Sequence, residues 1–217
     1  MHPRIVQAEL LDLLPPAHPD VRHNRRDLRL INLVMGNHRW LGRTLRAGAR
    51  PGERLLELGA GTGELAVHLN RAGRPVDGLD RCPAPDGWPP AAQWHRADLR
   101  HFDGFGAYAV VYGNLIFHQF AAGELRSLGG RLQAHSRLLV ACEPARWRRS
   151  QRLFGLLAPL FGANYVSRHD GRVSIAAGFL GEELPHLLGL DPARWEWRCA
   201  TTPLGAYHLT AWRREEP

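Results

Sequence analysis

The sequence predicts an α/β fold with a mostly parallel sheet and helices on both of its faces. Short apolar runs alternate with helical patterns along the chain, which is the order of elements that a parallel sheet requires. The first such unit, residues 54–80, reads as a strand, a glycine-rich turn, a helix and a second strand that ends in a carboxylate. At 217 residues with 44% hydrophobic residues, the chain is long enough for one such domain and a modest elaboration.

Helical patterns open the chain. Residues 5–14 have the spacing of a short amphipathic helix, and a longer helical pattern follows until Gly36 interrupts it. A further helix is expected over residues 39–46. We therefore assign residues 1–50 to an N-terminal helical lid over a cleft and residues 51–217 to the main domain, as a single structural unit.

The predicted sheet has seven strands. Five of them alternate with helices, and the last two flank the turn-rich segment TTPLG, which is typical of a hairpin. A parallel core should therefore end in an antiparallel hairpin. The expected strands are 54–58, 75–79, 93–96, 108–113, 137–142, 194–200 and 206–212, and the expected helices between or after them are 63–72, 122–134 and 147–161.

The glycine-rich turn has the pattern E-x-G-x-G-x-G, formed by Glu57, Gly59, Gly61 and Gly63. A dinucleotide fingerprint would place glycine or alanine at position 64, where this chain has Glu64. Glycines let a backbone pass close to a ligand because they carry no side chain. The turn resembles motif I of the class I S-adenosylmethionine-dependent methyltransferases.

The resemblance implies a Rossmann-like methyltransferase fold, with S-adenosylmethionine as cofactor and S-adenosylhomocysteine as product. Asp80 matches the acid that takes both ribose hydroxyls, and Arg81 would lie beside the adenine. Asp98 matches the acid that accepts a hydrogen bond from the adenine amino group, with the backbone of Leu99 alongside. The alternatives are a solvated loop acid for Asp80 and a helix cap for Asp98.

The same resemblance assigns the amino acid end of the cofactor. Glu57 would lie under the glycine turn and take hydrogen bonds from its backbone or from the methionyl ammonium, and Asn114 would end the fourth strand near the reaction centre. These matches run from about residue 54 to residue 143. The full set of predicted cofactor residues is Glu57, Gly59, Ala60, Gly61, Gly63, Asp80, Arg81, Asp98, Leu99 and Asn114.

The segment GNLIFHQF, residues 113–120, bears on the acceptor. Enzymes that methylate the exocyclic amines of nucleobases often have Asn/Asp-Pro-Pro-Tyr here, and this chain lacks both prolines. The segment resembles small-molecule methyltransferases of the ubiquinone and menaquinone pathways, which implies methyl transfer to a small, aromatic or quinol-like acceptor, most often at oxygen. His118 is then a candidate general base, because imidazole titrates near neutrality. The alternative is a packed histidine that hydrogen-bonds to the backbone.

Two further regions supply candidate substrate contacts. In the lid, the resemblance implies that Asn37 and Arg39 contact the cofactor carboxylate or the acceptor, the alternative being a helix that only packs. Near the C-terminus, Tyr165, Arg168 and the second candidate base His169 lie in ANYVSRHDGRVSIAAGF, where class I enzymes often insert an acceptor wall. The alternative for that segment is an ordinary polar surface loop.

The charge balance argues weakly for a polyanionic partner. The net charge is +7, but all 28 basic residues are arginine, which together with abundant alanine, glycine and proline suggests a GC-rich coding bias. We therefore expect a small-molecule acceptor and no nucleic-acid partner. An RNA methyltransferase and a non-catalytic, methyltransferase-like binding protein remain the alternatives.

The cysteines and the apolar runs limit which compartments, metal sites and membrane contacts are expected. Cys82, Cys142 and Cys199 are odd in number and widely spaced, so we expect no disulfide framework, no metal site and a cytoplasmic location. No apolar run approaches the ~20 residues that span a bilayer. Peripheral membrane contact is expected only if the acceptor is a lipid quinone.

Overall fold

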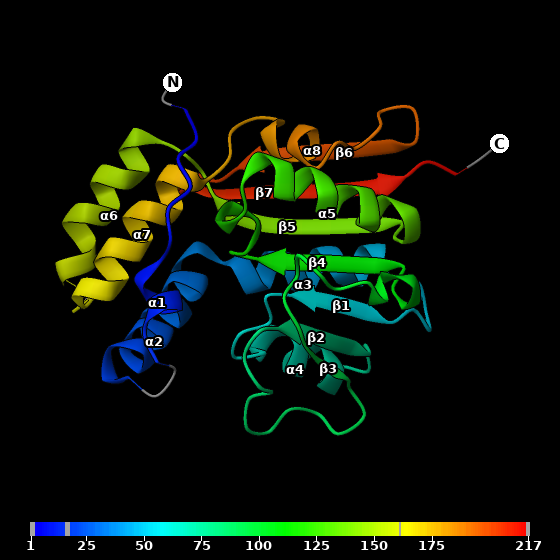
Figure 1. The fold of residues 1–217 in the computed structure, drawn as a ribbon, viewed down its shortest axis with the longest axis horizontal. Helices are drawn as coiled ribbons and strands as arrows, with labels where there is room; N and C mark the ends of the chain where they lie inside the picture. The colour runs from blue at the N-terminus through cyan, green and yellow to red at the C-terminus, as the bar shows by residue number, and fades with distance from the viewer. Residues whose placement is uncertain (1–2, 16–17, 161, 216–217) are drawn as a thin grey trace.

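The centre of the molecule is a seven-stranded sheet in the order β3-β2-β1-β4-β5-β7-β6 (Figure 1). The computed structural model describes residues 3–15, 18–160 and 162–215. Strands β1 to β5 run parallel, while β7 is antiparallel to both β5 and β6, so the predicted fold class and closing hairpin are confirmed. The strands are β1 (Leu55–Leu58), β2 (Val76–Asp80), β3 (Trp94–Arg96), β4 (Val110–Asn114), β5 (Leu138–Pro144), β6 (Trp195–Thr201) and β7 (Ala206–Arg213).

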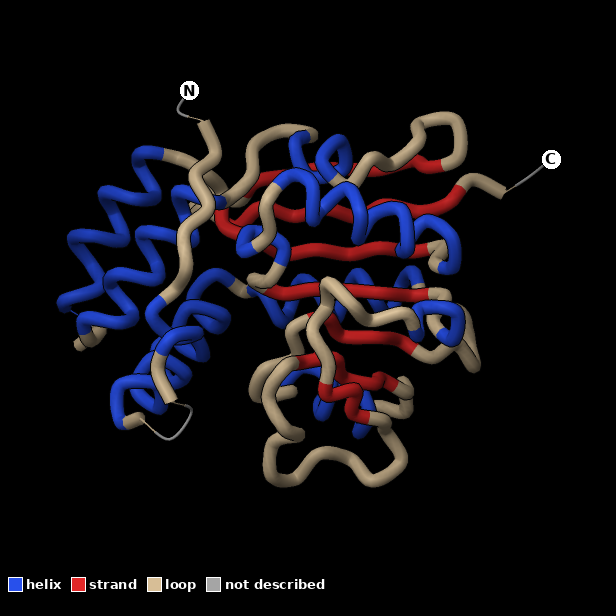
Figure 2. The backbone as a smooth tube through the Cα atoms, viewed as in Figure 1, coloured by secondary structure: helices blue, strands red, loops and turns tan. Residues whose placement is uncertain are grey.

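Helices cover both faces of this sheet (Figure 2). Leu55 and Leu56 show why: successive side chains of a strand point to opposite faces, and these two pack into different apolar clusters. Leu55 packs in the cluster with helices α3 (Asn37–Gly48) and α4 (Glu64–Arg71). Leu56 packs in the cluster with α5 (Ala122–His135) and α8 (Glu183–Leu187).

The remaining helices form a cap beyond the carboxyl ends of the parallel strands (Figure 1). They are α1 (Leu10–Leu13), α2 (Pro19–Met35), α6 (Arg148–Leu160) and α7 (Tyr165–Ala177). Both α2 and α6 pack on α7, so the cap combines segments from the two halves of the chain. The predicted break at Gly36 is present, with φ of 70°. Helix α3 beyond it packs on β5 of the sheet and also contacts α2 of the cap. Within the described residues, no helix has the length and apolar character to cross a bilayer.

The segment considered as an acceptor wall, with a polar surface loop as the alternative, forms helix α7. Asn164 caps its first turn, since the side-chain Oδ1 accepts a hydrogen bond from the Ser167 N–H at 2.9 Å. Val166, Val173 and Ala177 are buried at helical intervals along one face. The signal was thus in the sequence, as an asparagine cap followed by apolar residues at a helical period.

The N-terminal segment is also different from the expected helix over 5–14. Only Leu10–Leu13 is helical, and the residues before it run as an extended chain along α7. The Ile5 N–H donates to Ala176 O at 3.2 Å, and Asp170 accepts hydrogen bonds from the backbone of Leu10 and Leu11. These tertiary hydrogen bonds replace the ones that a longer helix would have made. We name residues 3–15 the strap.

Two 3₁₀ turns complete the chain. Turn η1 (Gly104–Ala107) precedes β4, and turn η2 (Phe117–Gln119) follows it. Turn η2 places His118 next to the cap, because β4 ends at the sheet edge that the cap covers. The carboxyl ends of parallel strands are where ligands bind in open α/β sheets, so this edge holds the candidate site.

Candidate functional site

A cavity of about 900 Å³ lies between the carboxyl ends of β1, β2 and β4 and the cap. Residues of the strap, α2, α6 and α7 form its outer wall. Most of the predicted cofactor residues lie on its wall, although they come from four separate segments. They are Glu57, Gly59, Ala60, Gly61, Asp80, Arg81, Asp98, Leu99 and Asn114.

The glycine turn follows β1 and uses the left-handed backbone region at all three glycines. Gly61 faces open space, because a Cβ there would meet nothing closer than Gly59 O at 3.9 Å. A Cβ on Gly59 would clash with Ile116 at 2.6 Å. Gly63 is the exception to the predicted set: it does not line the cavity, and it packs against the Trp88 ring instead. Only Gly61 therefore leaves room for a ligand.

Asp80 closes β2 beside this turn. Its Oδ2 accepts a hydrogen bond from the Gly61 N–H at 2.9 Å, and its Oδ1 accepts one from the Cys82 N–H at 2.8 Å. The carboxylate is thus fixed in orientation at the cavity wall. Arg81, the next residue, pairs with Asp12 of the strap at 2.8 Å. The strap therefore reaches the predicted ribose and adenine end of the site.

Asp98 lies at the end of β3 with Leu99 on the cavity wall. The Arg100 guanidinium binds its carboxylate at 2.6 Å and lowers the pKa of Asp98 to about 2. The same carboxylate accepts a hydrogen bond from the Arg100 N–H at 2.9 Å. The Asp98 carboxylate is therefore ionised at neutral pH, and Arg100 already supplies part of its hydrogen bonds. Its contact with an adenine stays a prediction.

Glu57 lies buried below the glycine turn. Burial raises the pKa of Glu57 to about 8, and the nearby charges of Asp80 and Glu64 act in the same direction. Its Oε2 has no hydrogen-bond partner among the described residues. A buried carboxyl group in this state is costly unless a donor reaches it. A ligand ammonium at this point would supply both a hydrogen bond and a positive charge.

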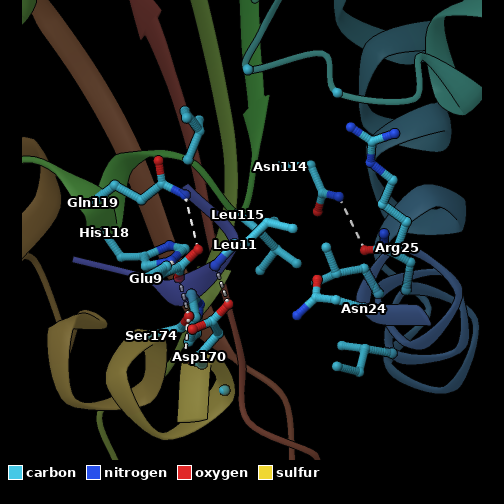
Figure 3. Close-up of a pocket in the computed structure, with 18 of the residues that line it drawn as sticks. Glu9, Leu11, Asn24, Arg25, Asn114, Leu115, His118, Gln119, Asp170 and Ser174 are labelled. Carbon is cyan, nitrogen blue, oxygen red and sulfur yellow. Dashed lines mark hydrogen bonds and ion pairs between the residues drawn. The ribbon is translucent and has the colours of Figure 1, made fainter. Parts of the chain in front are cut away.

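Three asparagines join the cap to the end of β4. Asn32 of α2 accepts hydrogen bonds from the side-chain amides of Asn37 and Asn114, each at 3.0 Å, and the bond from Asn114 is drawn in Figure 3. The Oδ1 atoms of Asn37 and Asn114 have no partner within the described part of the chain. Asn114 and Asn32 line the cavity, whereas Asn37 is buried behind it.

His118 is buried and bound on both sides of its ring. Its Nδ1 lies 2.6 Å from Glu143 Oε2. Its Nε2 lies 3.1 Å from Glu9 Oε1, and these two side chains are seen next to each other in Figure 3. Burial opposes the charged ring, but the contacts with Glu143 and Glu9 outweigh it and raise the pKa of His118 to about 9. An imidazolium that donates from both nitrogens has no lone pair to accept a proton. This arrangement favours a role in holding the strap over that of a general base.

The turn around His118 shapes the reaction edge. Glu143 accepts hydrogen bonds from the backbone of Ile116 and Phe117 at 2.9 Å each. Leu115, just before them, is the non-glycine residue with positive φ among those described, at 58°, and it lines the cavity. A bulky residue in this region costs about 1–2 kcal/mol, so the surrounding structure holds it there.

The other predicted contacts lie off the cavity wall. Arg39 is exposed on α3, and Tyr165, Arg168 and His169 are exposed on α7. On α7 the reason is the helical conformation: Tyr165, Arg168 and His169 point outward, while residues of the opposite face of α7 line the cavity. His169 Nδ1 lies 3.1 Å from Asp170 Oδ1, so these two neighbours form an ion pair when the imidazole is protonated. Their roles in binding or catalysis gain no support from these positions.

Several cavity residues were missed by the sequence interpretation. Ser167 of α7 donates to Asp27 Oδ2 of α2 at 2.6 Å, and Ser174 donates to Glu9. Asn24 and Asp27 line the cavity together with apolar residues of α2. The available signal was their spacing: Asn24, Asp27, Leu28 and Ile31 share one helical face, which places polar groups in an apolar stripe.

Neither a family model nor a curated protein matches this sequence. Solved structures do match it. The plantazolicin methyltransferase BpumL in complex with S-adenosylhomocysteine has a TM-score of 0.69 and 12% identity, covering 92% of each chain. A SAM-dependent methyltransferase from Anabaena variabilis ATCC 29413 has a TM-score of 0.57 and 14% identity, covering 79% of this chain and 82% of its own.

A third similar structure, the methyltransferase domain of bacterial CtHen1, has a TM-score of 0.57 and 12% identity, covering 84% of this chain and all of its own (100%). This chain has the class I methyltransferase fold. The strand order and the closing hairpin of this chain are those that the sequence resemblance implied. The narrower resemblance to ubiquinone and menaquinone enzymes gains no support from these three structures.

Proposed function

We propose that this protein transfers a methyl group from S-adenosylmethionine to a small acceptor bound between α2, α7 and the end of β4. The observation that carries the proposal is the edge of the sheet where Gly61 leaves open space, Asp80 is fixed beside it and Glu57 has an unpartnered oxygen. In BpumL, a protein of the same fold, S-adenosylhomocysteine has been seen in complex.

The cavity residues fit that cofactor by their chemistry. The Asp80 carboxylate suits the vicinal diol of the ribose, and Arg81, Asp98 and Leu99 would surround the adenine. Glu57 would receive the methionyl ammonium, with the Asn114 oxygen nearby. Bound S-adenosylmethionine supplies an activated methyl group as a sulfonium, so the protein has to align the acceptor and exclude water.

The apolar wall of the cavity supports an acceptor with a flat or apolar body. Leu153, Phe154 and Leu157 of α6 and Leu28 and Ile31 of α2 line it. This agrees with the small, aromatic or quinol-like acceptor that the sequence resemblance implied. Transfer to oxygen stays a prediction from that resemblance, and the buried, doubly bound His118 offers it no ready base.

Calorimetry with Asp80 variants tests the cofactor assignment. We expect S-adenosylhomocysteine to bind the wild type, and Asp80→Ala to weaken binding at least about tenfold because the ribose loses charge-assisted hydrogen bonds. Asp103 is an exposed acid off the cavity wall, so Asp103→Asn is the matched control and should bind as the wild type does. Equal binding by Asp80→Ala, or preferential binding of a nicotinamide dinucleotide, overturns the proposal.

A further inference from the structure

Part of the cavity wall consists of oxygen atoms that accept hydrogen bonds. Carboxylates approach it from the strap, α2 and α7, and amide oxygens approach it from α2 and β4 (Figure 3). This composition contrasts with the whole chain, whose net charge is +7. We name this region the inner chamber, and define it by Glu9, Asn24, Asp27, Asn114, Ser167 and Asp170.

Two of its carboxylates are held by neutral donors. Asp27 accepts the Ser167 hydroxyl at 2.6 Å, and Asp170 accepts the backbone of Leu10 at 2.7 Å and of Leu11 at 3.0 Å. Neutral donors fix these carboxylates in place without cancelling their charge. Each of these carboxylates also lies near an imidazole, Asp27 near His23 and Asp170 near His169. These contacts are ion pairs only when the imidazole is protonated.

The other charges of the chamber are matched or lie elsewhere. Glu9 faces the charged ring of His118, and Asp12 faces Arg81. Two further arginines on the cavity wall are also paired, Arg29 with Glu64 and Arg100 with Asp98. Arg25 lines the cavity as well, and it lies near enough to Cys82 at the cofactor end to influence that thiol. Among the described residues, no ion pair joins Asp27 or Asp170 to an arginine, so their negative charges remain available to a ligand.

Asn24 supplies an independent indication. It is 2% exposed, lines the cavity, and its Oδ1 has no hydrogen-bond partner among the described residues. It lies one helical turn before Asp27, so a free amide oxygen and a carboxylate share one face of α2. The Oδ1 of Asn114 is likewise without a partner in the described chain. Buried acceptors left unpaired are costly, and a ligand that donates hydrogen bonds to them would remove that cost.

We propose that the methyl acceptor is a basic nitrogen, an alkylammonium carried on an apolar body of about the size of one aromatic ring. An ammonium has three donors and no acceptor, and so complements a chamber of oxygens. The ring would lie against the leucines and Phe154 of α6. A phenolate would instead meet the charges of Asp27 and Asp170. This inference rests on the proposed function, since it names the substrate class of the same site.

The transfer balances without a further reactant. The ammonium releases one proton through the Asp27 carboxylate to water, which leaves a nitrogen lone pair. That pair forms the new N–C bond while the C–S bond of the sulfonium breaks and its electrons stay on sulfur. The products are the methylated amine, which carries the positive charge on nitrogen, and S-adenosylhomocysteine, in which the sulfur is an uncharged thioether.

A matched pair of probes tests the binding part. Calorimetry compares 2-phenylethylamine, which is an ammonium at pH 7.5, with 2-phenylethanol of the same shape. We expect the amine to bind at least about tenfold more tightly, because hydrogen bonds to a charged group are the stronger kind. Affinities within twofold of each other, or no binding of the amine, overturn the proposal.

Three variants test whether the preference for the amine over the alcohol arises in the inner chamber. Asp27→Asn should lower the ratio of amine to alcohol affinity about tenfold, and Asn24→Leu about threefold. Asn24→Leu removes no side-chain hydrogen bond that the described residues show, so it should fold. It therefore keeps the test decisive if Asp27→Asn fails to fold. Asp103→Asn, outside the cavity, should leave the ratio unchanged. A ratio that none of the cavity variants alters rejects the inner chamber as its source.

Tyramine, which carries both a phenol and an amine, tests the acceptor atom. With methyl-labelled S-adenosylmethionine, mass spectrometry should find the label on nitrogen, whereas label on the phenolic oxygen or none at all counts against the proposal. The probes can also be titrated into cofactor-free protein. If S-adenosylhomocysteine does not bind, the proposed function fails, while the amine preference is still measured by itself.

Discussion

Gly61 and Gly63 belong to one turn and have different physical roles. Both have positive φ, at 53° and 65°, so a residue with a side chain would be strained at either position. Gly61 faces the cavity, whereas a Cβ on Gly63 would approach the Trp88 ring at 2.6 Å. The sequence motif alone predicted that both glycines contact the cofactor. The structure separates a ligand-facing glycine from a packing glycine.

We therefore expect opposite profiles for their alanine variants. Gly61→Ala should lose about 1 kcal/mol of unfolding free energy from backbone strain and at least about tenfold in affinity for S-adenosylhomocysteine. Gly63→Ala should lose about 2 kcal/mol or more, because strain and the clash with Trp88 add, yet bind the cofactor within about threefold. Denaturant melts and calorimetry measure the two quantities. Identical profiles would contradict the separation.

His118 predicts a pH dependence of stability. Its pKa is raised to about 9 in the folded protein, above the ordinary value of 6.5. The stabilisation from the charged ring is thus fully present below about pH 6.5 and is lost as the pH rises through 9. The melting temperature of the wild type minus that of His118→Gln should shrink across this window. His101 is exposed, so His101→Gln serves as the control, and a constant difference argues against a charged His118.

At the scale of elements, the strap and α7 depend on each other. Glu9 receives hydrogen bonds from Ser174 of α7 and from His118 and Gln119 of η2, while Asp170 of α7 holds the backbone of the strap. Neither segment has these partners along its own sequence. This is why the sequence predicted too long a helix in the strap and did not predict the helix α7.

Weakening one contact of the strap should therefore loosen it as a unit. In Glu9→Gln the charge opposite His118 is lost, so we expect amide hydrogen exchange to speed up over residues 3–15 and stay unchanged in β1 and β4. Exchange measured by mass spectrometry checks this, with the exposed Glu182→Gln as the control. Unchanged exchange in the strap would show that its backbone contacts with α7 suffice to hold it.

At the scale of the whole molecule, the charge of +7 has to be weighed against a cavity rich in oxygen atoms. Surface arginines attract polyanions in general, which kept an RNA methyltransferase open as an alternative. A small acceptor uses the cavity and not the surface. The two functions therefore differ in their response to salt.

We expect S-adenosylhomocysteine and amine binding to change less than about threefold between 50 and 500 mM salt in the presence or absence of RNA. Binding to an RNA oligonucleotide should fall steeply with salt and should not stimulate label transfer. Fluorescence polarisation and label incorporation measure these quantities. RNA that binds and becomes methylated would establish the alternative.

The sequence by itself determined the sheet, its closing hairpin and the glycine turn with Asp80, because these follow from local periodicity and from residues close along the chain. It did not determine the cap or the inner chamber. Asp27 meets Ser167, and Glu9 meets His118, across more than a hundred residues. Such pairs form only when packing brings distant segments together, so tertiary structure alone decided what faces the acceptor.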